Sequence, residues 1–144
     1  MQKDHENTFI TTMLTGLFIG IIDTLICLAY NIGYRNFTGY TPSALINVSS
    51  LIFAVNLLLL LTGMIYFLFR RVFGSRDYVY VTLAILFTGF LAWQTEIGHR
   101  FADPTLNAES KGLLLGIVLI LGCSAILLPF FYRSKFFEKH VLDL

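Results

Sequence analysis

Two polar side chains interrupt long apolar runs of this sequence, Asp23 and Asn56. A carboxylate near the centre of a bilayer costs about 2.5–3.5 kcal/mol even on the lenient insertion scale, so Asp23 must face protein or water, or carry a proton. At about 1.5 Å per helical residue, both residues lie roughly 11–12 Å from the same end of their runs. We therefore expect Asp23 and Asn56 to hydrogen-bond. One interpretation is a proton or cation site, and the other is an uncharged Asp23 that donates to Asn56 and fixes the helix register.

A second set of polar and aromatic residues lies at the ends of the first and third apolar runs. It consists of Asn31, Tyr34, Arg35, Trp93, Glu96, His99 and Arg100. If these two ends face each other at one depth, they form a basic pocket, rimmed by aromatic rings, for an anionic lipid headgroup or a small solute. The alternative is that each residue anchors its own helix end in the membrane interface.

Glu96 and His99 have the Glu-x-x-His spacing that helices of carboxylate-bridged di-iron proteins carry. Such a site needs a second copy of the motif and further glutamates, but the corresponding positions are Asn31 and Tyr34, which cannot serve. We therefore expect no metal and no cofactor. Cys27 lies in an apolar run, as does Cys123, and both are interpreted as small hydrophobic residues.

The composition indicates that these residues are held by membrane helices. The chain has 144 residues, enough for one domain, and 56% of them are hydrophobic while 13% are charged. Four segments reach the roughly 20 apolar residues that a helix needs to cross a bilayer. They run from Phe9 to Tyr30, Val48 to Phe69, Tyr78 to Glu96 and Gly112 to Tyr132. The predicted fold is an all-α bundle of four transmembrane helices in a single domain.

The basic residues that flank these spans predict the orientation. Lys3, Arg70, Arg71, Arg76, Arg133, Lys135 and Lys139 fall on one side, and Arg35, Arg100 and Lys111 fall on the other. Because cytoplasmic loops carry the excess of lysine and arginine, we expect both termini in the cytoplasm. The net charge of +1 gives no indication of nucleic-acid binding.

Two short segments resemble each other. Ile32-Gly33-Tyr34-Arg35 follows the first span and Ile97-Gly98-His99-Arg100 follows the third. Each precedes a loop with a proline and then another apolar span, which is the pattern of two tandem helical hairpins in parallel orientation. The alternative is coincidence, because apolar helices resemble one another.

Small residues at helical spacing predict the packing faces, since membrane helices associate through close backbone approach. On the first span, Gly16, Gly20, Asp23, Cys27 and Asn31 form one stripe. Ser49, Asn56 and Gly63 share a face of the second span, and Thr82, Gly89, Trp93 and Glu96 share a face of the third. On the fourth, Gly112, Gly116 and Cys123 do so.

Three functions follow from these patterns. The first is a non-catalytic membrane subunit or oligomeric component, packed through the glycine faces. The second is a small transporter or channel that uses Asp23 and Asn56, entered from the pocket at Arg35 and Arg100. The third is an enzyme acting on a lipid headgroup, with Glu96 or His99 as general base, for which the sequence offers no evident nucleophile. We favour the first, with lipids and other membrane subunits or copies of the chain as partners.

Overall fold

The computed structural model describes residues 2–39, 48–74, 76–98 and 102–134, with side chains from Thr8 onward. Four helices account for nearly all of these residues. They are α1 (Gln2–Thr38), α2 (Val48–Phe73), α3 (Asp77–Ile97) and α4 (Pro104–Arg133). The predicted all-α four-helix fold is confirmed.

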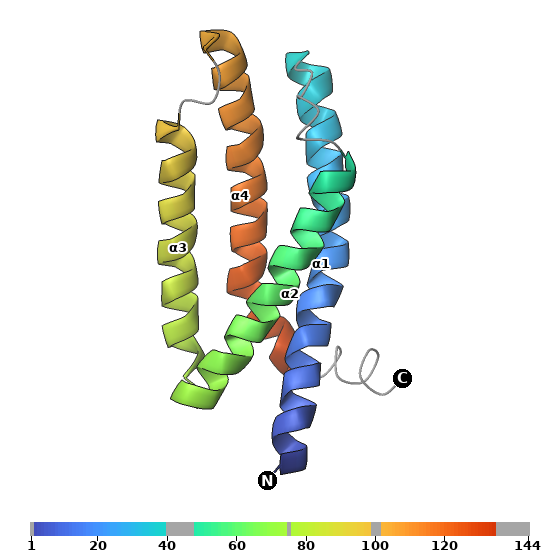
Figure 1. Cartoon of the computed structure of the whole chain (residues 1–144), viewed down its shortest axis with the longest axis vertical. Helices are drawn as coiled ribbons and strands as arrows, with labels where there is room; N and C mark the ends of the chain where they lie inside the picture. Colours follow the sequence, from blue (N-terminus) through green and yellow to red (C-terminus); the bar gives the residue numbers. More distant parts are fainter. Residues whose placement is uncertain (1, 40–47, 75, 99–101, 135–144) are drawn as a thin grey trace.

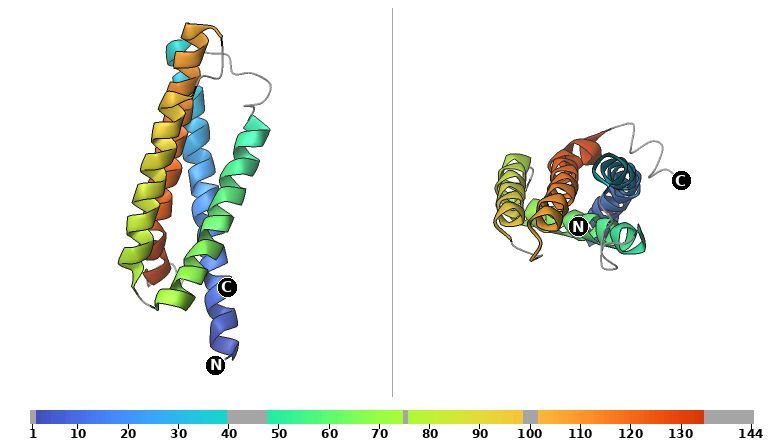
Figure 2. Two further views of the ribbon diagram at one scale, coloured as in Figure 1. Left: turned by 60° about the vertical axis from the view of Figure 1, so that its left-hand side comes forward. Right: turned by 90° about the horizontal axis from the view of Figure 1, so that it is seen from above.

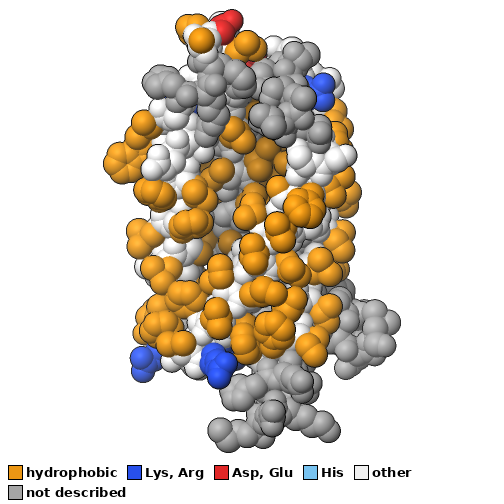
Figure 3. Space-filling view, viewed as in Figure 1, with side chains coloured by type: hydrophobic (Ala, Val, Ile, Leu, Met, Phe, Trp, Pro, Cys, Tyr) orange, Lys and Arg blue, Asp and Glu red, His pale blue; other side chains and the backbone are white. Residues whose placement is uncertain are grey.

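Each helix is long and apolar enough to cross a membrane. The shortest, α3, has 21 residues, which at about 1.5 Å per residue matches the roughly 30 Å hydrocarbon core. Figure 3 shows apolar side chains over the middle of the visible face and lysine or arginine side chains near its two ends. The chain is therefore a multi-pass membrane protein.

The helices alternate in direction along the bundle (Figure 1). One end of the bundle, here called the termini end, holds the start of α1, the link between α2 and α3, and the end of α4. The opposite end, the loop end, holds the ends of α1 and α3 and the starts of α2 and α4. In both figures α4 lies between α3 and α1, while α2 crosses from α3 at the termini end to α1 at the loop end (Figures 1 and 2).

The first helix extends beyond the predicted span at both ends. The polar residues before Phe9 contain no helix breaker, so the helix continues through them from Gln2. At the other end it runs past Tyr30 to Thr38 and stops at Gly39, which has a φ of 73° and donates its N–H to the carbonyl of Arg35. This left-handed glycine is a common helix terminator, and it sets the end of α1 later than the apolar run does.

The fourth helix begins at Pro104, eight positions before the predicted Gly112. Asp103 caps it, because its side chain accepts from the N–H of Thr105 over 2.9 Å. Proline is favoured at the first helical position after such a cap. The hydroxyl of Thr105 also donates to Asp103, and the two hydrogen bonds lower the pKa of the Asp103 carboxyl below its ordinary value.

The remaining boundaries differ little from the prediction. Helix α2 continues past Phe69 to Phe73 and ends at Gly74, which has a φ of 66°. Helix α3 is one residue longer at each end than the predicted span from Tyr78 to Glu96. The two hairpins, α1–α2 and α3–α4, point the same way, and their origin by duplication stays a prediction.

Candidate functional site

The polar stripe of α1 is the buried face of that helix. Gly16, Gly20, Asp23, Cys27 and Asn31 are all buried. The first two glycines contact α2, where a Cβ on Gly16 would lie 2.5 Å from the carbonyl oxygen of Leu59. A Cβ on Gly63 would lie 2.6 Å from the carbonyl oxygen of Thr12. The two helix backbones therefore meet at Gly16 and Gly63, where no larger residue fits.

Asp23 lies on the side of α1 that faces α4. Its side chain is 1% exposed, and Oδ1 accepts a hydrogen bond of 2.7 Å from Ser124. The second carboxyl oxygen, Oδ2, is buried and has no hydrogen-bond partner among the described residues. Cys27, one turn further along α1, is also fully buried. The structure thus holds a carboxyl group of which half is satisfied, in the interior of the bundle.

Asn56 lies on the other side of α1, so the predicted bond between Asp23 and Asn56 is wrong. Its Nδ2 donates to Thr24 Oγ1 over 2.8 Å and to the carbonyl of Ile52 over 2.9 Å. Consecutive helical residues point about 100° apart. Thr24 therefore faces α2 while Asp23 faces α4, and equal depth does not bring Asp23 and Asn56 together.

Two tyrosines of α1 fit over two glycines of α4. A Cβ on Gly116 would collide with the ring of Tyr30, and one on Gly112 would collide with the hydroxyl of Tyr34. Tyr30 donates to the carbonyl of Gly112 over 3.0 Å, and Tyr34 donates to the carbonyl of Glu109 over 2.9 Å. These glycines therefore accommodate aromatic rings instead of a neighbouring helix backbone. The matched spacing of four in both pairs was the signal in the sequence.

Of the predicted pocket residues that the structure describes, Tyr34 lies in this interface, and Asn31 is buried one turn before it on α1. Asn31 is 3% exposed, and its Oδ1 has no partner among the described residues. Arg35 is exposed at the end of α1, and Trp93 is 66% exposed on α3. Because α4 lies between α1 and α3, the described members on these two helices do not gather in the one pocket that was expected. His99 and Arg100 lie outside the described residues.

A different pocket occupies the loop end, between α3 and the first turns of α4. Its volume is about 520 Å³, and its lining residues are Glu96, Ala102, Pro104, Asn107, Ala108, Lys111 and Gly112. Of the described residues that were expected in a pocket, Glu96 is the one that lines it. From the sequence, Lys111 was expected only to be a charge that flanks a span.

The packing face predicted for α3 is also wrong. Thr82, Gly89, Trp93 and Glu96 are exposed, and no described atom outside the helix's own backbone lies within 4 Å of a Cβ placed on Gly89. The opposite side packs on α4, where Thr88 lies against Gly122 so closely that a Cβ there would collide with it. On α4, Cys123 is exposed, and on α2 Ser49 is exposed. Small residues line both sides of α3, so the sequence does not reveal which side faces the bundle.

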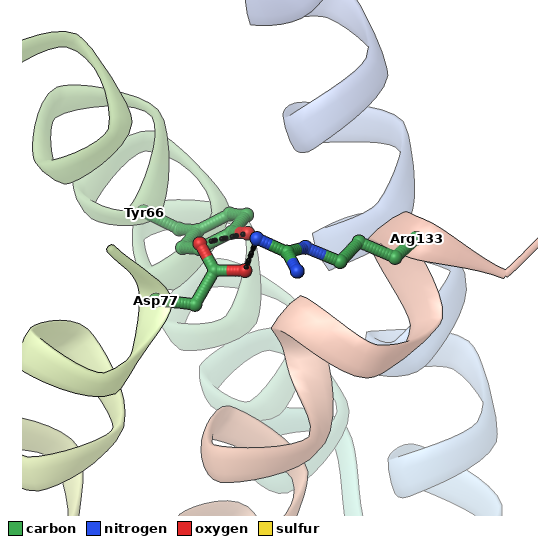
Figure 4. Close-up of polar contacts among 3 residues, drawn as sticks. All are labelled: Tyr66, Asp77 and Arg133. Atoms are coloured by element: carbon green, nitrogen blue, oxygen red, sulfur yellow. Dashed lines mark hydrogen bonds and ion pairs between the residues drawn. The ribbon is translucent and has the colours of Figure 1, made fainter. Parts of the chain in front are cut away.

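An aromatic and ionic cluster at the termini end was not predicted. Asp77 accepts from the hydroxyl of Tyr66 over 3.0 Å and pairs with Arg133 over 2.6 Å (Figure 4). The rings of Tyr80 and Tyr132 contact that of Tyr66 with centroids 4.9 and 5.6 Å away. The guanidinium of Arg70 lies 4.5 Å from the Tyr132 ring, a cation–π contact. This cluster, here called the clasp, joins α2, α3 and α4.

Within the described part of the chain, no group of three or more histidine, cysteine or acidic residues is arranged to hold a metal ion. No family model, no curated protein and no solved structure matches the chain. We therefore infer function from the described side chains.

Proposed function

We propose that the protein is a non-catalytic membrane component that packs through α3 against another membrane helix, from a second copy of the chain or from another subunit. The observation that carries this proposal is the position of Gly89. It lies in the middle of α3, on the exposed side, and no described atom outside the helix's own backbone lies within 4 Å of a Cβ placed there. A glycine does not improve the packing of lipid against α3, whereas it lets the backbone of a neighbouring helix approach closely.

Its surroundings on α3 support the same proposal. Thr82 lies on the exposed side with Gly89, and a polar side chain on such a face can hydrogen-bond to a neighbouring helix. Helix α3 is the least enclosed of the four, because only 11% of its most apolar stretch is buried in the bundle. It therefore has the largest share of surface left for a partner.

Disulfide cross-linking in native membranes tests this proposal. The background replaces the native cysteines, Cys27→Ala and Cys123→Ser, and the test variant adds Gly89→Cys. We expect Gly89→Cys to form an oxidant-dependent disulfide. The adduct has twice the chain mass if the partner is a second copy, and otherwise contains another subunit into which single cysteines have been introduced. Gly33→Cys is the matched control, because Gly33 is exposed on α1 and a Cβ there has no described neighbour outside its own helix within 4 Å. Equal adducts at both positions would contradict the proposal.

The orientation is proposed from the charges that the structure describes. Arg70, Arg71, Arg76 and Arg133 lie at the termini end, and Arg35 and Lys111 lie at the loop end. This excess supports a cytoplasmic termini end, with both chain termini inside. Arg76→Cys should then resist a membrane-impermeant thiol reagent in intact cells and react after lysis. Reaction in intact cells would reverse the orientation.

A second candidate function is cation or proton passage, favoured by the free oxygen of Asp23. A buried carboxyl oxygen without a donor is an unfavourable arrangement that a proton or cation would relieve. This function predicts that Asp23→Asn abolishes flux into proteoliposomes while the protein stays folded. A non-catalytic packing component would show no flux in either form.

A further inference from the structure

The pocket at the loop end places opposite charges around one volume. Glu96 reaches it from the last turn of α3, and Lys111 reaches it from α4. Ala108 of α4 lines the pocket with them, and its small side chain leaves room between the two charges. At about 520 Å³, the pocket is within the range of small-ligand sites, about 300–1,000 Å³.

The two charges do not neutralise each other. Arg133 and Asp77 pair at the termini end, but no described residue forms an ion pair with Glu96 or with Lys111. A carboxylate and an ammonium that face one pocket without meeting are complementary to a ligand that carries both signs of charge. A purely anionic ligand would be attracted by Lys111 and repelled by Glu96.

The pocket is also at the depth of lipid headgroups. Trp93, one turn before Glu96, is exposed on α3, and tryptophan is enriched where the bilayer meets water. The pocket opens between the ends of two helices that are apolar over their remaining length. A lipid lying against α3 and α4 would therefore bring its headgroup to Glu96 and Lys111.

We propose that this pocket binds the phosphoethanolamine group of a zwitterionic phospholipid. The ammonium of the ligand pairs with the Glu96 carboxylate, and its phosphate pairs with the Lys111 ammonium. Each contact is a charge-assisted hydrogen bond, the stronger class of polar contact. A phosphoglycerol headgroup offers the phosphate without the ammonium and satisfies Lys111 only.

The test is native mass spectrometry of the full-length protein released from vesicles with equal amounts of phosphatidylethanolamine and phosphatidylglycerol. We expect the ethanolamine lipid to be retained about fivefold over the glycerol lipid, the ratio that one partly exposed ion pair of about 1 kcal/mol gives. Glu96→Gln should bring this ratio to about one, since it removes the group that distinguishes the two lipids. Lys111→Gln should lower retention of both.

Asp103→Asn is the control, because it removes a carboxylate at the same end while asparagine caps a helix equally well. The ratio should not change in this variant. Titration with soluble phosphoethanolamine then separates the two sources of this chemistry: displacement of the retained lipid assigns the site to lipid, whereas binding without any lipid retention assigns it to a solute. Equal retention of both lipids by the unmodified protein, or an unchanged ratio in Glu96→Gln, would overturn the proposal.

Discussion

The hydroxyl of Tyr80 on α3 donates to the backbone carbonyl of Ala125 on α4 over 3.0 Å. Ala125 precedes Pro129 by four positions, and Pro129 has no N–H to give that carbonyl its helical bond. Tyr80 is 4% exposed, so water does not substitute for it. A side chain of one helix therefore completes the backbone hydrogen bonding of its neighbour, as proline within a membrane helix requires.

This relationship predicts an energetic coupling between Tyr80 and Pro129. Tyr80→Phe should lower the free energy of unfolding by about 1–2 kcal/mol, because it leaves a buried carbonyl without a donor. In a Pro129→Ala background the new N–H supplies the bond, so Tyr80→Phe should cost less by about 0.5–1 kcal/mol. Reversible unfolding in mixed micelles measures the stability of the unmodified protein, the two single variants and the double variant. Additive effects would show that Tyr80 stabilises α4 by packing alone.

The glycines of the bundle should differ in their tolerance of a single methyl group. Gly16→Ala and Gly63→Ala each drive a Cβ into a backbone carbonyl, which cannot move aside as a side chain can. We expect each to destabilise the protein by about 1–3 kcal/mol. Gly33→Ala should be neutral or stabilising by up to about 1 kcal/mol, because no described atom outside its helix crowds the site and alanine favours helix. Thermal denaturation in detergent ranks the three, and a destabilised Gly33→Ala would contradict this packing.

The clasp contains one strong and one weak contact of Asp77. Its partner Tyr66 is fully buried, whereas the side chain of Arg133 is 54% exposed. Asp77→Ala should therefore cost about 1–3 kcal/mol, because the buried O–H of Tyr66 loses the acceptor to which it donates. Arg133→Gln should cost less than about 1 kcal/mol, as exposed ion pairs do. The same unfolding assay compares them, and the reverse ranking would mean that the ion pair holds the helices together.

Asp23 depends on Ser124 for its described hydrogen bond. Ser124→Ala should destabilise the bundle by about 1–3 kcal/mol, since it leaves both carboxyl oxygens of a buried side chain without a donor. Cys123→Ala, the exposed neighbour on α4, is the control and should change stability by less than about 0.5 kcal/mol. Equal stability of the two variants would indicate that Asp23 finds another partner, such as water or a bound cation.

Asp103 gives the loop end a dependence on pH. Its pKa is lowered in the folded protein by hydrogen bonds from Thr105, so its stabilising contribution is present above the ordinary value of 3.8 and lost as pH falls through the lower folded value. Amide exchange at Thr105, corrected for intrinsic rates, should therefore accelerate at low pH. Asp103→Asn should remove this acceleration while it keeps the cap. Acceleration in both proteins would assign it to another group.

The sequence predicted the number of helices, because apolar length alone decides which segments can cross a bilayer. It predicted the buried face of α1, where glycine, aspartate, cysteine and asparagine coincide on one side. It failed for α3, where small residues line both sides and only tertiary contacts decide which one faces α4. The partner of Asp23 was missed because equal depth in the membrane does not show which side of α1 a residue faces, and Asp23 faces α4 instead of α2. The start of α4 was missed although Asp103 and Pro104 form a recognisable helix start.

The most direct test of an assembly through α3 is the subunit composition of the protein released gently from its own membrane, measured by native mass spectrometry. We expect a complex larger than one chain, whose abundance falls about tenfold in Gly89→Leu, the effect of losing about 1.4 kcal/mol of packing. Gly33→Leu, at an equally open site on α1, should leave the complex unchanged. A single chain that carries lipids and nothing else, or a complex that Gly89→Leu does not weaken, would contradict an assembly built on this face of α3.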